Sequence, residues 1–390
     1  MGLILRSSSL ANPGDSVTVK GSTLDWVEGD GNFVYLLNKI NSGSGVPGGL
    51  DTQIQFNSGS TFAGDSTFTF NYTNQSLQQG DNTTANGYAS HTEGYKTSTV
   101  LEYSHDEGDS TVAAGYGAHS EGTYTSASGN YSHTEGYGAI ASGEASHAEG
   151  FGIADGQESH AEGGGAALAT GAHAEGYSFS IANLSHSEGF FSMVADLAMK
   201  YDLYDNGGKY YDFALKELYV QGDVTTVAVT DTYAVTRFYN NPPVPRSGKI
   251  VNASYDIGNN FTTVVFSEDI NIGNDLTNLE SQYGVYFKPA APQDGGSLFG
   301  AHAEGFATLA VGEYSHAEGY ATYAMETGSH AEGYYTSASG SYSHAEGANT
   351  LTAGVGSHAE GINTSAIGIA SHAGGYGTVA SGSYQTAIGI

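Results

Sequence analysis

The chain has 390 residues, including 57 glycines, 28 tyrosines and no cysteine, and only 13% of its residues are charged. This charged share is about half that of an average soluble globular protein, and the missing cysteines exclude both disulfides and thiolate metal sites. Eleven basic against 41 acidic side chains give a net charge of −30 at pH 7, which predicts no nucleic-acid partner.

Residues 1–50 carry little repetition and are interpreted as a short N-terminal attachment segment. The apolar run at the start is too short for a signal peptide, and no stretch reaches the roughly 18 apolar residues of a membrane span, so we expect no membrane insertion. Residues 24–40 fit an amphipathic helix with Trp26 and Phe33 on its apolar side. A cap on the repeats that follow is the alternative interpretation. Residues 51–80 are expected to form a β-rich connector.

The motif Ser-His-Ala-Glu-Gly recurs with variations in two blocks, and it contains all 14 histidines of the chain. The first block, residues 81–189, holds eight repeats spaced by 14 residues and then by 13, and the second, residues 301–390, holds six repeats spaced by 14. Glycine follows three residues after every histidine. Glutamate follows two residues after every histidine except His372, where Gly374 takes its place.

Alternation within this motif predicts strands, because side chains of a strand point to opposite faces in turn. Histidine and glutamate then share one face, and serine, alanine and glycine share the other. A turn of about 14 residues leaves room only for small side chains inside it, and glycine suits corners that need a positive φ. The sequence therefore predicts an all-β, parallel β-roll, a solenoid whose turns stack at about 4.8 Å.

A coil lined by alanine and serine has almost no apolar core, so we expect it to gain burial by self-association. The outward histidines and glutamates would line the seam between copies, where each imidazole can donate a hydrogen bond to a carboxylate. Pairing of this kind predicts a raised histidine pKa, and a contribution to assembly that weakens as pH rises. The expected seam residues are His91, Glu93, His133, Glu135, His147, Glu149, His316, Glu318, His344 and Glu346.

Between the two blocks, residues 190–300 lack the repeat and are interpreted as an inserted β-rich domain. Residues 233–238 and 261–266 are rich in β-branched and aromatic side chains, which predicts strands. Exposed tyrosines could stack on sugars or contact proteins, although core or subunit contacts are the alternative. The receptor-binding candidates are Tyr201, Tyr204, Tyr210, Tyr211 and Tyr239.

The frame Ser-x-Ala-x-Gly, followed seven residues later by Ala-x-Gly, resembles the head repeat of YadA-like trimeric adhesins. Residues 365–368 and 386–389 come close to the Ala-Ile-Gly of that family. The resemblance implies a left-handed parallel β-roll in a homotrimer. Here histidine and glutamate stand where aliphatic side chains commonly face the trimer axis.

Three features also resemble phage tail-fibre and tail-spike proteins: the Ser-His-Ala-Glu-Gly repeat itself, residues 20–33 and residues 51–59. Residues 384–389 resemble the junction that precedes a self-cleaving chaperone domain in such fibres, which suggests removal of a C-terminal assembly domain. The resemblance implies a structural and adhesive fibre subunit of a virion. It would bind other tail proteins through its N-terminal segment, and a host surface glycan or protein outside the cell.

Two other functions were weighed. A bacterial cell-surface adhesin would need an export signal and an anchor. A polysaccharide-depolymerising spike would need a carboxylate pair, for which Asp202, Asp205 and Asp212 are the first candidates. Because no histidine differs from its neighbours, the repeats predict neither a catalytic residue nor a metal site. We expect a protein that is not an enzyme and that needs no cofactor.

Overall fold

The computed structural model describes residues 50–58, 61–195, 217–225, 250–267 and 300–389, and the backbone of a few further strands. Every regular element in this described part is a strand, so the all-β prediction is confirmed. The helix predicted over residues 24–40 lies outside the described residues. Near the N-terminus, β1 (Leu3–Leu5) and β2 (Val17–Val19) form a parallel pair.

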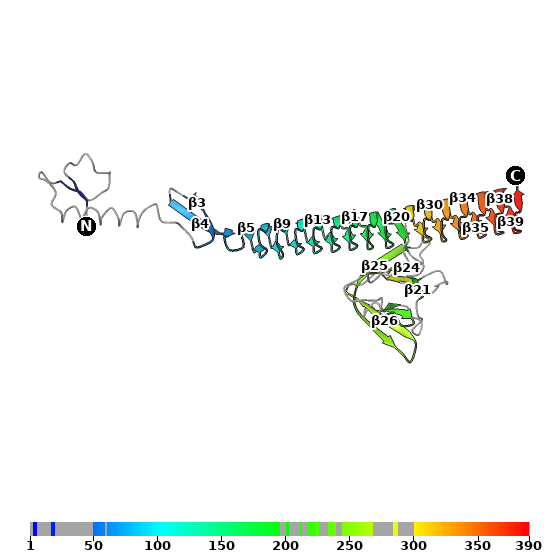
Figure 1. Ribbon diagram of the computed structural model, residues 1–390, viewed down its shortest axis with the longest axis horizontal. Helices are drawn as coiled ribbons and strands as arrows, with labels where there is room; N and C mark the ends of the chain where they lie inside the picture. The colour runs from blue at the N-terminus through cyan, green and yellow to red at the C-terminus, as the bar shows by residue number, and fades with distance from the viewer. Residues whose placement is uncertain are drawn as a thin grey trace.

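A short antiparallel meander leads into the long body of the molecule (Figure 1). It consists of β3 (Gln53–Ser58), β4 (Thr61–Asn71) and β5 (Ser76–Asp81), each paired antiparallel with the next. Strand β5 then pairs in parallel with β7, Leu77 beside His91. The meander thus provides the first rung of the parallel sheet.

The body is a parallel β-solenoid in which each turn has a first strand, beginning at the histidine in most turns, and a shorter second strand. The first strands are β5, β7 (His91–Tyr95), β9 (His105–Asp109), β11 (His119–Thr123), β13 (His133–Gly136), β15 (His147–Gly150), β17 (His160–Ala161), β19 (His173–Ser180), β20 (His186–Val194), β28 (His302–Phe306), β30 (His316–Tyr320), β32 (His330–Tyr334), β34 (His344–Ala348), β36 (His358–Ile362), β38 (His372–Tyr376) and β40 (Thr386–Ile388). The second strands are β6 (Thr84–Ala85), β8 (Ser98–Thr99), β10 (Val112–Ala113), β12 (Ser126–Ala127), β14 (Ile140–Ala141), β16 (Ile153–Ala154), β18 (Ala166–Ala167), β29 (Leu309–Ala310), β31 (Tyr323–Ala324), β33 (Ser337–Ala338), β35 (Leu351–Thr352), β37 (Ser365–Ala366) and β39 (Val379–Ala380). Strands β19 and β20 run through both positions of their turns.

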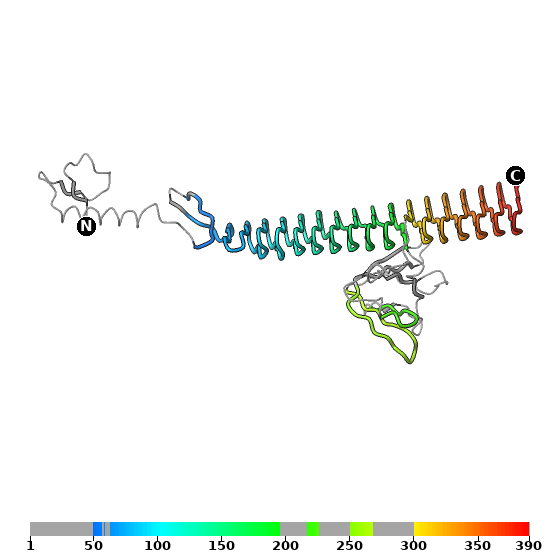
Figure 2. Tube along the Cα trace, in the orientation of Figure 1, coloured from blue at the N-terminus to red at the C-terminus, as the bar shows by residue number. Residues whose placement is uncertain are grey.

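The turns keep one register along the whole solenoid, with histidine beside histidine from one turn to the next. This register continues from β20 to β28, where His186 lies beside His302 although the two are far apart in sequence. The second strands keep the same order, with Met193 beside Leu309. Figure 2 shows the resulting coil as an uninterrupted rod. The predicted parallel β-solenoid is confirmed.

Small side chains fill the interior of the solenoid, as predicted from the motif. Ala113 and Ala127, which end second strands, have no exposed surface. The serine or alanine before each histidine is also buried, and the Ser132 hydroxyl donates a 2.6 Å hydrogen bond to the Gly129 carbonyl. Equivalent bonds recur in several turns. One interior position differs from the rest, because the carboxyl of Asp106 is fully buried there.

Backbone crowding explains the glycine that ends each motif. Gly122 has a φ of +105°, and a Cβ on it would lie 2.1 Å from the carbonyl oxygen of Gly136 in the next turn. Most 14-residue turns place a residue with positive φ two positions further on, such as Tyr124 at +57°. The three 13-residue turns, which begin at His147, His160 and His173, lack one residue at this corner.

Between β20 and β28 the chain forms a second, antiparallel sheet of seven strands. Its strands are β21 (Lys200–Asp202), β22 (Tyr211–Asp212), β23 (Glu217–Gln221), β24 (Tyr233–Phe238), β25 (Val244–Asp256), β26 (Phe261–Phe266) and β27 (Gly284–Phe287). The strands predicted over residues 233–238 and 261–266 are confirmed as β24 and β26. Strand β25 contacts β20 of the solenoid.

The outward side of the second strands is apolar and buried near this contact, which the sequence analysis missed. Leu168 and Ile181 are 0% and 1% exposed, whereas Val100 and Ile367 at the equivalent position of distant turns are 45% and 46% exposed. The buried cluster also contains Ala166, Phe179, Met193, Ala195, Leu309 and Val311. The middle of this face is therefore covered within the single chain.

Candidate functional site

The outward side of the first strands carries a row of stacked histidines, which we call the histidine row. Successive rings lie 4.6 to 5.1 Å apart between centroids, and most are within 10° of parallel. The row passes from His186 to His302 with the same 4.8 Å spacing. Parallel register alone fixes this spacing, because equivalent side chains of neighbouring strands lie about 4.8 Å apart.

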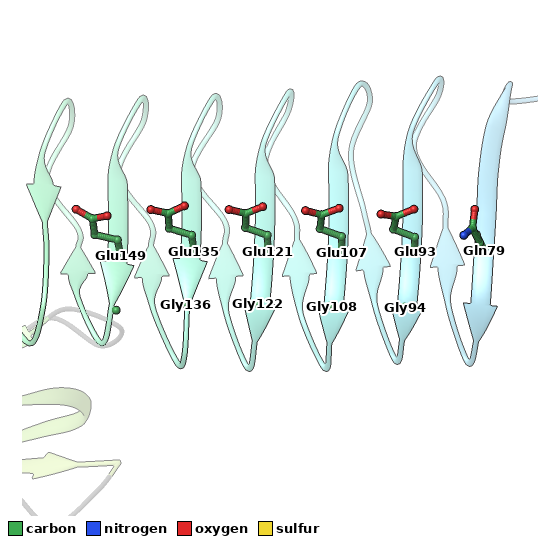
Figure 3. Close-up of a pocket in the computed structure, with 11 residues that line it drawn as sticks. Gln79, Glu93, Gly94, Glu107, Gly108, Glu121, Gly122, Glu135, Gly136 and Glu149 are labelled. Atoms are coloured by element: carbon green, nitrogen blue, oxygen red, sulfur yellow. The ribbon is translucent and has the colours of Figure 1, made fainter.

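The glutamates two residues further along the same strands form a second row beside the first. Figure 3 shows five of them, from Glu93 to Glu149, pointing the same way from adjacent rungs, with Gln79 at the end. The glycines from Gly94 to Gly150 line the shallow groove below them. Neighbouring carboxyls at Glu149 and Glu121 hold the pKa of Glu135 below its ordinary value. The groove is thus a strip of closely spaced acidic groups.

Histidine and glutamate approach each other in most turns without forming hydrogen bonds. The Nε2 to carboxylate distances run from 3.3 Å for His372 and Glu360 to 4.0 Å for His344 and Glu346. The His372 contact meets hydrogen-bond geometry, whereas the Nε2 atoms of the other described histidines have no hydrogen-bond partner. The predicted seam residues therefore lie on one face, as two adjacent rows with loose ion-pair contacts.

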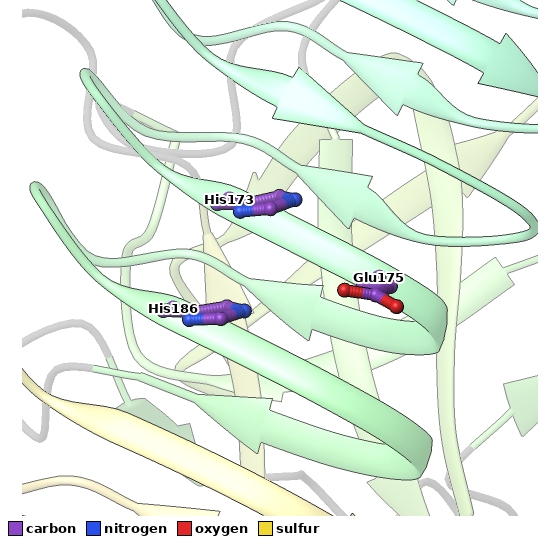
Figure 4. A group of neighbouring side chains, drawn as sticks. All are labelled: His173, Glu175 and His186. Carbon is purple, nitrogen blue, oxygen red and sulfur yellow. The ribbon is translucent and has the colours of Figure 1, made fainter.

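Several groups of two histidines and one glutamate lie close enough to suggest a metal site, as for His173, Glu175 and His186 (Figure 4). The two rings in this group are parallel and 4.7 Å apart. A zinc ion binds imidazole nitrogen at about 2.0–2.1 Å, so two nitrogens on one ion are separated by at most about 4.2 Å. Parallel rings at the observed spacing cannot both reach one ion. One imidazole and one carboxylate remain, fewer than a zinc site uses.

The pKa of six histidines shifts, in the single chain, in the direction opposite to the one predicted from the sequence. Burial of the ring lowers the pKa of His119, His302 and His330, and the neighbouring histidines lower it further. The glutamates oppose this shift but do not outweigh it. His91, His147 and His173 shift in the same direction. The prediction counted the carboxylates and omitted both the burial of the rings and the stacked imidazoles. For the seam between copies, which it concerned, it stays a prediction.

We therefore expect acid to destabilise the solenoid. A histidine whose pKa is lower in the folded chain contributes fully to the free energy of unfolding above the ordinary histidine pKa of about 6.5. This contribution is lost as pH falls through the lowered pKa. Thermal unfolding followed by circular dichroism should show a midpoint a few degrees lower at pH 5 than at pH 7.5, since about 1 kcal/mol shifts it by roughly 2–4 °C.

The matched variant is His330→Gln, which removes a ring that faces His316, His344, Glu318 and Glu332. Its midpoint should depend less on pH than that of the parent chain. A parent midpoint that rises on acidification would contradict the lowered pKa values. The measurements should be repeated in the Asp106→Thr variant, which lacks the buried interior carboxyl. The titration of that carboxyl changes stability with pH in the opposite direction.

No protein-family model matches the chain, and no curated protein matches it in sequence. Within the described residues no helix is long and apolar enough to cross a membrane. The geometry of the rows and of the sheet is therefore the basis for assigning a function.

The receptor-binding candidates fall in the part of the sequence that contains the second sheet. Tyr201 lies in β21 and Tyr211 in β22, where the backbone is described and the side chains are not. Tyr204, Tyr210 and Tyr239 lie outside the described residues. Which of these tyrosines reach a common surface stays a prediction.

Proposed function

We propose that the chain is a structural and adhesive subunit of a homotrimeric virion fibre, with no enzymatic activity. The observation that carries this proposal is the unbroken histidine row, which keeps its register from His91 to His372 past the second sheet. A surface repeated without variation over a rod suits lengthwise association better than binding of one small ligand. The rod would extend from the virion, and the second sheet would project from it.

The histidine and glutamate rows form the face on which the three copies meet. The opposite, second-strand face is less suitable, because its middle is already buried where β20 contacts β25. In this arrangement each chain is a left-handed β-roll, and three such rods turn their histidine and glutamate rows toward a common axis. Histidine and glutamate side chains that are about one-third exposed in one chain would then be buried. Such an arrangement follows cyclic symmetry, the usual organisation of homo-oligomers.

The remaining parts receive roles by position. Residues 1–50 would bind other virion tail proteins, and residues 190–300 would contact a glycan or protein on the host surface. A bacterial surface adhesin would use the same rod. A depolymerase is the weaker candidate, because Asp202 and Asp212 lie in β21 and β22, which are not paired with each other, and Asp205 lies outside the described residues.

Light scattering of the purified chain tests the association. We expect a mass of three times the 40.3 kDa of one chain. A folded monomer at micromolar concentration would contradict the proposal. Incubation with capsular polysaccharide distinguishes a depolymerase from an adhesive fibre. A depolymerase would lower the viscosity of the solution, and an adhesive fibre would leave it unchanged.

A further inference from the structure

Two columns of exposed aromatic side chains flank the histidine and glutamate rows. The first column is the residue four positions after each histidine, near the end of the first strand, and this residue is aromatic in nine of the fourteen turns. The second column lies two or three positions before the start of each first strand. Five members of the first column and five of the second are more than half exposed: Tyr137, Phe151, Tyr177, Tyr334 and Tyr376, and Tyr103, Tyr131, Tyr314, Tyr342 and Tyr384.

Rings within each column already contact one another. Tyr320 and Tyr334 stack in the first column with centroids 5.1 Å apart, and Tyr116 and Tyr131 pack edge to face in the second at 5.5 Å. Single exposed rings are ordinary, but contiguous apolar strips on a soluble protein mark interaction surfaces. Rings held by their neighbours also lose less freedom on binding.

The backbone gives a second reason to assign these rings a partner. Tyr131 and Tyr342 have φ values of +57° and +56°, a left-handed conformation that bulky residues rarely adopt. Equivalent corners use glycine at nearly the same φ, as in Gly328 at +61° and Gly356 at +62°. The Tyr131 and Tyr342 rings lie over Gly117 and Gly328 of the preceding turn, where a Cβ would come within 3.1 Å and 2.8 Å of the ring. Both tyrosines nevertheless stay more than half exposed, so most of each ring is open to a partner.

We propose that the two columns form the seams between neighbouring copies, with the first column of one chain packed against the second column of the next. This inference rests on the proposed trimer and adds where its chains touch. The strand between the columns runs from the second to the first, so parallel copies around an axis bring unlike columns together. Each chain then gives one column to each neighbour, a heterologous contact that closes into a ring.

A second copy fits these columns better than another partner does. Its columns have the same rise of about 4.8 Å per turn, so the columns keep the same spacing, and rings can meet in the turns that carry them. Fourteen histidine turns at that rise give a strip about 65 Å long. With a width of about 10 Å, one seam covers roughly 650 Å² per chain, close to the ~800 Å² per partner of a stable interface.

Cysteine pairs test this seam, since the chain has no cysteine of its own. The double variant Tyr131→Cys and Tyr137→Cys places one thiol in each column at the two ends of β13. About six extended residues separate them, up to roughly 20 Å, too far for a disulfide within one chain. Each single variant is the matched control. Oxidation, and in parallel a bis-maleimide of about 10 Å, would be followed by denaturing gels and light scattering.

We expect covalent trimers from the double variant, with little product from either single variant. Covalent dimers from one single variant would show that like columns meet, and would overturn the seam. A trimeric mass without any cross-linked product would also overturn it, while leaving the proposed trimer intact. A folded monomeric rod would instead refute the trimer, and the seam with it. Circular dichroism of the reduced variants confirms that they fold.

Discussion

Replacing Gly122 by alanine is expected to damage the solenoid strongly for a change of one methyl group. The new Cβ would lie 2.1 Å from the Gly136 carbonyl oxygen, and the residue would keep a φ of +105°. Both the clash and the strained backbone oppose folding, so we expect a loss on the order of 4 kcal/mol. Because contacts in a solenoid are between neighbouring turns, hydrogen exchange should accelerate first around β9, β11 and β13.

Gly356→Ala is the matched control. Gly356 also has a positive φ, +62°, but a Cβ on it would have no heavy atom within 4 Å. Its loss should be about 1 kcal/mol, the cost of a left-handed conformation alone. Thermal unfolding of the two variants separates backbone preference from collision between turns. Equal losses of stability in the two variants would show that close contact with the next turn does not determine the glycine at position 122.

Asp106→Thr is expected to stabilise the rod at neutral pH. Burial raises the pKa of Asp106 to about 6, an effect only partly offset by the Thr111 hydroxyl and the Ser98 N–H, and the nearby charge of Glu107 adds to the rise. A carboxyl with a raised pKa in the folded chain destabilises it once pH exceeds the ordinary value of about 4. Its removal should gain up to about 3 kcal/mol at pH 8.

The gain from Asp106→Thr should shrink below about 1 kcal/mol at pH 4, where the carboxyl is protonated in the folded chain and about half protonated in the unfolded chain. Threonine is chosen because Thr92 and Thr134 occupy the same interior ladder. Asp106→Asn keeps the shape of the side chain and should show the same dependence on pH. A gain that is equal at pH 4 and pH 8 would mean that packing, and not charge, sets the stability at this position.

The repeat allowed much of the solenoid to be predicted. Period-two alternation placed Ala148 inside and His147 outside, and the histidine spacing indicated the parallel register. The buried patch around Leu168 and Ile181 was not predicted, although the sequence shows large apolar residues at outward positions of the 13-residue turns. Its burial depends on a contact between β20 and β25 that spacing does not encode.

The sequence predicted which residues form the candidate site, but it did not predict how their pKa values shift. The sequence identified histidine and glutamate as neighbours on one face. It did not reveal the burial of the His330 ring, which lowers its pKa, or the stacking of His316 on it at 4.8 Å, which lowers the pKa of His330 further. Asp106 occupies the alanine position of the motif, which the alternation places inside, so its burial was readable from the sequence although it was not predicted.

Continuity between β20 and β28 has a mechanical consequence. Force applied along the solenoid passes from the turn of His186 to that of His302 through hydrogen bonds between adjacent turns, and it bypasses the chain between them. The solenoid can therefore carry tension along its length independently of that chain segment. The bonds that carry axial load lie along the rod and open one turn at a time, so a strained rod would unwind progressively from an end.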